Sequence, residues 1–150
     1  MRSHWLGAVM LCTACGSGGF SIEERPLSGV VGGAPWSFVA GDTNAFLSDD
    51  DFFANLYDRE FNTCEFGPAA GSSLILNIPM QVGSYELGQF LTMTFVVEDD
   101  DGPLNLISTE GGIRVDEITD TTISGGVDAT FDGDNSVNGL FELTICPDDA

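Results

Sequence analysis

The sequence predicts an all-β domain, an antiparallel meander that forms a single small barrel or sandwich, behind a distinct N-terminal segment. Three observations predict this fold. Apolar residues recur at every second position in several stretches, which is the spacing that buries one face of a strand. Glycine-rich turns separate these stretches at short intervals. No stretch has the period of three to four residues that a helix would show.

The N-terminal segment, residues 1–14, has the pattern of an export signal. Arg2 provides a positive start, and residues 5–14 form an uncharged apolar run. This run is shorter than the roughly 20 apolar residues that a membrane-spanning helix needs, and it suits the apolar region of a secretory signal peptide. A buried apolar N-terminal segment is the alternative reading.

Residues 11–15, Leu-Cys-Thr-Ala-Cys, resemble the lipobox of bacterial lipoproteins, in which small residues precede a cysteine that becomes diacylated and N-terminal. Cys12 departs from that pattern, where an aliphatic residue usually stands. The resemblance implies a lipid on Cys15 that anchors the exported protein to the cell envelope, and Gly16 after the cysteine implies the outer membrane. A flexible Gly/Ser tether is expected over residues 15–26. Secretion without a lipid is the alternative.

The β-domain is expected over residues 27–147, and its first half begins with a hairpin. Two apolar stretches flank Gly32-Gly33, a pair that favours a tight hairpin turn, and Pro35 should lie at a strand start or a sheet edge. The elements expected up to the middle of the chain are strands at 27–31 and 36–40, a turn at 41–44, strands at 52–57 and 61–66, a turn at 67–71 and a strand at 73–78.

The second half shows the clearest alternation. Residues 83–88 should bend into a strand at 91–97, where Leu91, Met93, Phe95 and Val97 share one face. The later elements expected are an acidic break at 98–103, a hairpin of 104–108 with 113–118 across Gly111-Gly112, a long strand at 123–131, a turn at 132–135 and a last strand at 141–146.

Four stretches resemble a group of small uncharacterised bacterial lipoproteins with a Gly-rich antiparallel β-domain. They are Gly-Ser-Tyr-Glu-Leu-Gly at 83–88, the Gly-led strand at 112–118, the Ile-Ser-Gly strand at 123–131 and the Asn-Gly strand at 138–143. The resemblance covers roughly residues 27–146, and the chain departs from it at Gly126-Val127. It implies the fold and the location and carries no activity.

Composition excludes several functions. The chain has no lysine, and removal of residues 1–14 leaves three arginines against 24 acidic residues, a formal charge of −21. Such a surface does not bind nucleic acid, and its self-repulsion favours a monomer. His4, the single histidine, leaves with the signal, so the usual general bases and nucleophile activators are absent. We therefore expect no enzyme and no cofactor, with an acid-pair hydrolase as the remaining catalytic alternative.

Cys64 and Cys146 remain once Cys12 has left with the signal and Cys15 carries the lipid. An even pair in an exported domain predicts one disulfide. Two free thiols are the alternative, and a metal site is disfavoured because two thiolates without histidine lack the usual four ligands.

Acidic loops and aromatic side chains are the remaining candidates for a binding site. Asp49–Asp51, Glu98–Asp101 and Asp132–Asn135 could offer oxygen ligands to calcium, although the last does not fit an EF-hand, because Val137 stands where the loop needs glycine. The aromatic residues that could form a sugar- or lipid-binding face, or simply the core, are Trp36, Phe52, Phe53, Tyr57, Phe61 and Tyr85. The sequence thus favours an anchored envelope protein with a structural or ligand-binding role; a calcium-dependent adhesion or carbohydrate-binding module is the alternative, and the protein or glycan partner stays open.

Overall fold

The computed structural model describes residues 19–44, 51–68 and 70–147, and these contain strands and no helix. The all-β class that the sequence predicts is confirmed. The strands are β1 (Ser28–Val31), β2 (Ala34–Ser37), β3 (Ala40–Asn44), β4 (Asp51–Tyr57), β5 (Ser73–Pro79), β6 (Gly83–Glu86), β7 (Met93–Asp99), β8 (Gly102–Ser108), β9 (Glu110–Ile118), β10 (Thr122–Asp132) and β11 (Asn135–Ile145). A helix long and apolar enough to cross a bilayer is not found among the described residues.

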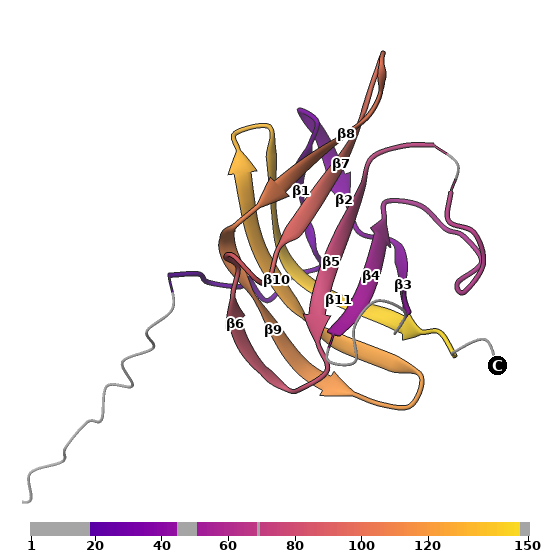
Figure 1. Ribbon diagram of the computed structural model, residues 1–150, viewed down its shortest axis with the longest axis vertical. Helices are drawn as coiled ribbons and strands as arrows, with labels where there is room; N and C mark the ends of the chain where they lie inside the picture. The colour runs from indigo at the N-terminus through magenta and orange to yellow at the C-terminus, as the bar shows by residue number, and fades with distance from the viewer. Residues whose placement is uncertain (1–18, 45–50, 69, 148–150) are drawn as a thin grey trace, which may run out of the picture.

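The strands form one curled sheet in the order β6-β9-β10-β11-β3-β4-β5-β7-β8, with the β1–β2 hairpin attached to β11. The sheet bends into a half-barrel (Figure 1). The described strands pair antiparallel except for β11 and β3, where Thr144 and Ile145 lie parallel to Asp42 and Thr43. The long strand β11 is central: along one side it pairs with β10, and along the other it meets β1, then Pro26 through a parallel bridge to Leu140, then β3.

The core fills the concave face of this sheet. Strands β4 and β5 alternate strictly between buried and half-buried positions, so the period of two in the sequence becomes one apolar face. The largest side chains with almost no exposure are Phe95, Leu27, Leu56, Leu74, Leu76, Ile78, Met93, Ile113, Ile123 and Leu143. Full burial of an aliphatic side chain of this size stabilises the fold by roughly 1.5–3 kcal/mol.

The first hairpin forms around the predicted turn, but its second strand is Ala34–Ser37 instead of the predicted 36–40, because Ala40 already belongs to β3. Gly32 and Gly33 connect β1 to β2 with φ values of +61° and +75°, the left-handed pair that a tight two-residue hairpin turn requires. Among the described strands, β2 pairs with β1 alone, so Pro35, which cannot donate to a ladder, lies in an edge strand.

Two predicted elements between residues 41 and 66 are wrong. Residues 41–44 form strand β3 instead of a turn, because β4 on one side and β11 on the other supply partners that local propensity does not reveal. Residues 61–66 form a loop instead of a strand. Cys64 there has φ +65°, a left-handed conformation that no strand contains.

The predicted hairpin of residues 104–108 with 113–118 is also wrong. Strand β7 continues to Asp99, and β8 pairs back on it from Gly102, so the acidic stretch forms the end of a hairpin instead of a break. The chain then passes through Thr109 into β9, which contains Gly111 and Gly112 and pairs with β10 and β6. The predicted long strands at 123–131 and 141–146 do form, within β10 and β11.

Candidate functional site

Residues 20–26, here called the lead-in, lie across the outer, convex face of the sheet. The ring of Phe20 lies on Gly112 of β9, and Ile22 lies on Gly126 of β10. A Cβ atom added to Gly112 would be 2.2 Å from the Phe20 ring, and one added to Gly126 would be 2.5 Å from Cγ2 of Ile22. These two glycines leave a furrow in the sheet surface that the lead-in occupies.

Hydrogen bonds to the backbone of the lead-in hold it on the sheet along its length. The side chain of Asn138 accepts from Glu23 N at 2.8 Å and donates to Ser21 O at 2.8 Å. Further along, Leu140 N donates to Arg25 O at 2.7 Å. The lead-in therefore crosses β9, β10 and β11, and it bridges to β11 at Pro26 before the chain enters β1.

Charged side chains add a second set of contacts. Arg114 on β9 contacts Glu24 of the lead-in at 3.1 Å and Asp116 at 2.7 Å. Such exposed pairs contribute about 0–1 kcal/mol each. Arg114, one of the few cations in this acidic chain, thus links the lead-in to the sheet.

The structure differs here from the flexible tether expected over residues 15–26, because the part from Phe20 onward is bound to the sheet. Two signals in the sequence point to this contact. Phe20 and Ile22 alternate with polar residues, as in a strand. Gly112 and Gly126 lie inside strands, where glycine often marks the close approach of another backbone.

An open hollow of about 490 Å³ adjoins the end of the lead-in. Its lining combines an apolar floor with three carboxylates and one arginine, contributed by Glu24, Arg25, Pro26, Phe38, Asp116, Ser124, Gly125, Leu140, Phe141 and Glu142. A second hollow of about 420 Å³ lies between the start of β5 and the β7–β8 hairpin and includes Tyr57, Pro103 and Glu98. Both are of a size that ligand pockets have.

Gly112→Ala should loosen the lead-in. The three atoms nearest to the added methyl group would all belong to the Phe20 ring, so we expect the ring to leave Gly112 while the sheet keeps its hydrogen bonds. We expect faster cleavage by a glutamate-specific protease after Glu23 and Glu24 than in the unaltered protein. Gly88→Ala is the matched control, because nothing lies within 4 Å of a Cβ at that position. Equal cleavage rates for the two variants would refute the furrow.

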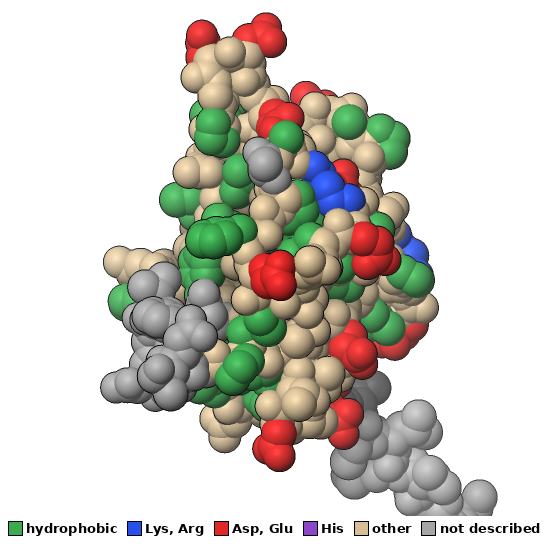
Figure 2. Space-filling model, turned by 90° about the vertical axis from the view of Figure 1, so that its right-hand side faces the viewer, with side chains coloured by type: hydrophobic (Ala, Val, Ile, Leu, Met, Phe, Trp, Pro, Cys, Tyr) green, Lys and Arg blue, Asp and Glu red, His purple; other side chains and the backbone are tan. Residues whose placement is uncertain are grey.

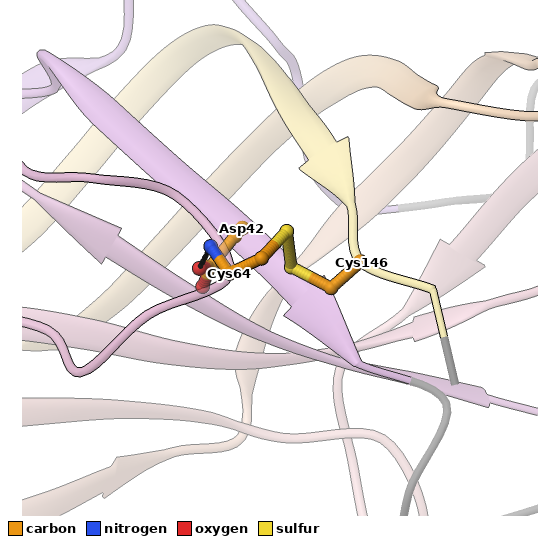
Figure 3. Close-up of side chains that lie close together, drawn as sticks. All are labelled: Asp42, Cys64 and Cys146. Carbon is orange, nitrogen blue, oxygen red and sulfur yellow. Dashed lines mark hydrogen bonds between the residues drawn. A yellow bond between two sulfur atoms is a disulfide. The ribbon is translucent and has the colours of Figure 1, made fainter. Parts of the chain in front are cut away.

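The predicted disulfide between Cys64 and Cys146 is confirmed. It joins the loop after β4 to the end of β11, and Figure 3 shows Asp42 of β3 beside it. Asp42 is 8% exposed, and its carboxylate accepts a 2.7 Å hydrogen bond from Cys64 N. Among the described residues, Asp42, Cys64 and Cys146 are also the one group of three whose ligand atoms lie within 4.8 Å of one another; with the sulfurs bonded to each other, the role of this group is to fix the loop.

Asp42 should give the protein a specific pH dependence. Burial raises its pKa above the ordinary 3.8, although hydrogen bonds from Cys64 N and Asn55 act in the opposite direction. A carboxyl group with a higher pKa in the folded state binds its proton more tightly there, so it lowers stability as the pH rises from 3.8 through the raised pKa. Asp42→Asn removes this titration and keeps an acceptor oxygen. The unfolding free energy of the variant minus that of the unaltered protein should increase between pH 3 and 7 in urea titrations. A constant or decreasing difference would contradict the assignment.

The acidic loops have structural contacts of their own. The turn Asp132–Asn135 is held by Asp132 Oδ1, which accepts from Asp134 N at 3.0 Å and from Asn135 Nδ2 at 2.9 Å. Asn135 Oδ1 in turn accepts from Gly32 N at 2.9 Å. The β7–β8 hairpin lies at the same end of the molecule (Figure 1), since Val97 contacts Gly32. Figure 2 shows acidic side chains at the tip of this hairpin and scattered over the face in view. Asp49 and Asp50 lie outside the described residues.

The aromatic candidates divide between the core and the surface. Trp36 and Phe52 are buried, at 3% and 7% exposure. Tyr57 and Phe61 pack edge to face with ring centroids 4.9 Å apart. Tyr85 and Phe53 are half-buried, so these six side chains do not form one exposed aromatic face.

These features define a single curled β-sheet whose N-terminal segment is fastened to its convex face and whose last strand is cross-linked by a disulfide. Comparison with protein-family models, curated proteins and solved structures gives no match to this chain. The proposed signal, Cys12 and Cys15 lie outside the described residues.

Proposed function

We propose that this protein is an exported lipoprotein of the bacterial cell envelope, anchored through a lipid on Cys15, whose β-domain has a non-enzymatic structural or ligand-binding role. The observation that carries the proposal is the lipobox-like stretch at residues 11–15. An outer-membrane location follows from Gly16 by the same resemblance.

Two structural observations support the proposal. The Cys64–Cys146 disulfide suits an exported protein, because disulfides persist in oxidising compartments. The sheet holds the lead-in from Phe20, which is five residues after Cys15 in the sequence, so a lipid at Cys15 would keep the domain close to the bilayer. The absence of lysine and histidine from the chain after residue 14 supports a non-enzymatic role, and the hollow beside the lead-in is the first place to seek a ligand. No contact among the described residues favours a calcium-dependent module over this proposal.

Replacement of the lipid-bearing cysteine tests the proposal. Cys15→Ser should move the protein from the membrane fraction to the soluble fraction, because stable anchoring depends on the acyl chains. Cys12→Ser is the matched control: it changes the neighbouring cysteine within the cleaved signal, and it should leave the protein in the membrane. Membrane retention of Cys15→Ser equal to that of the control would refute the lipid anchor.

A further inference from the structure

We propose that the side of the domain around the start of β9 lies against the membrane surface, with Phe90 inserted among the lipid headgroups of a bilayer of low net charge. This inference rests on the proposed function, because it takes the lipid on Cys15 as the anchor. It adds the face of the domain that meets the bilayer and the kind of lipid surface that this face accepts.

The length of chain between the anchor and the sheet limits how far the domain can move from the bilayer. Five residue steps separate Cys15 from Phe20, and a fully extended chain spans at most about 3.6 Å per step, or about 18 Å in all. Phe20 is already fixed on Gly112 near the start of β9. This side of the domain must therefore lie within about 18 Å of the lipidated residue, less than the width of a small domain.

Exposed apolar residues lie in segments that adjoin the start of β9. Phe90 is 89% exposed and lies in the turn from Gly88 to Leu91, which follows Leu87, whose N–H donates to Gly111 O at 2.9 Å. Glu86 is paired with Gly112, the residue on which the Phe20 ring lies. Phe90 thus belongs to the turn next to the point where the lead-in reaches the sheet, and Figure 1 shows the end of β6 and the start of the lead-in on one side of the molecule.

Two further apolar residues come from strands that meet the start of β9. Ile107, 56% exposed, precedes Ser108, whose Oγ donates to Glu110 O at 3.2 Å and to Thr130 O at 2.7 Å. Phe131, 45% exposed, follows Thr130, which is paired with Glu110. Ile107 and Phe131 therefore flank the junction of β8, β9 and β10. Together with Phe90 they are called the β9-start patch.

The negative charge of the domain determines which kind of lipid surface the β9-start patch can approach. The domain carries a formal charge of −21 after the signal, and Glu86 and Glu110 lie at the border of the patch. An anionic surface would repel such a domain, whereas zwitterionic headgroups would not. Aromatic side chains are favoured at the headgroup level.

Tryptophan emission in the lipidated full-length protein, reconstituted into phosphatidylcholine vesicles with brominated acyl chains, tests this inference. The emission that the new tryptophan of Phe90→Trp adds to that of Trp36 should fall about twofold when the bromines are present, because an inserted side chain lies 5–10 Å into the headgroup and acyl boundary. Phe66→Trp is the matched control: Phe66 is also fully exposed, but it lies in the disulfide loop. Its emission should be unchanged, as should that of buried Trp36. Adding Ile107→Ser and Phe131→Ser to Phe90→Trp should reduce the quenching, and anionic vesicles should give less quenching than phosphatidylcholine.

The mass of the N-terminal peptide, measured on the same sample, separates the two proposals. If acyl chains are present and Phe90→Trp is quenched selectively, the inference stands. If acyl chains are present and the two tryptophans are quenched equally or not at all, the inference fails and the anchor stands. If the new tryptophan of Phe90→Trp is shielded from solvent only in a dimer that forms without vesicles, a second copy of the chain occupies the patch, and the inference fails. If Cys15 carries no acyl chain, the proposed lipid anchor and this inference are both refuted.

Discussion

Loss of the Cys64–Cys146 disulfide is expected to cost about 4–5 kcal/mol of unfolding free energy, because the bond closes a loop of 82 residues in the unfolded chain. It also ties down the loop that carries Cys64, whose N–H bonds to the buried Asp42 carboxylate. The double variant Cys64→Ser with Cys146→Ser should therefore unfold at a much lower urea concentration than the unaltered protein.

The reduced, unaltered protein is the control for this prediction. Reduction removes the same cross-link without changing any other atom of the side chains, so its unfolding midpoint should agree with that of the double variant. A loss below about 1 kcal/mol in both would show that the unfolded chain is already constrained, and would contradict the expected role of the bond.

Phe95→Ala should cost about 3–5 kcal/mol, the range for truncation of a fully buried aromatic side chain. Phe95 has no exposed surface and lies on β7 between Leu74 of β5 and Leu106 of β8. Its loss would leave a cavity where three strands of the concave face meet. The measurement is the free energy of unfolding in urea.

Phe90→Ala is the matched control for Phe95→Ala. Phe90 lies a few residues earlier and is 89% exposed, so its truncation should change stability by less than about 0.5 kcal/mol. Equal losses at the two positions would contradict the position of the core. A neutral Phe90 variant would also show that membrane contact at this residue can be tested without unfolding the domain.

Local rules predict those parts of the fold whose partners are close in sequence. Gly32-Gly33 sets the first hairpin, because its turn demands left-handed backbone that glycine supplies. The alternation of Met93 and Phe95 identifies β7, because each buried side chain there faces the same core. The disulfide is predictable by elimination once Cys12 is assigned to the proposed signal and Cys15 to the proposed anchor.

The parts that sequence reasoning missed depend on distant partners. Residues 41–44 are rich in turn-forming residues, and they become β3 only because β4 and the end of β11 lie on both sides. Strand β8 pairs with β7 instead of β9, because two residues suffice to turn the chain between Asp99 and Gly102. The binding of the lead-in needs Gly112 and Gly126 to lie side by side with Phe20 and Ile22, a contact that joins segments about 90 to 100 residues apart.

The mass of the N-terminal peptide released from the membrane-extracted protein by a glutamate-specific protease tests the central claim most directly. The account predicts a peptide that begins at Cys15, ends at Glu23 or Glu24, and carries the added mass of two or three acyl chains. A peptide that begins elsewhere, or one that begins at Cys15 without a lipid, would contradict the anchored lipoprotein.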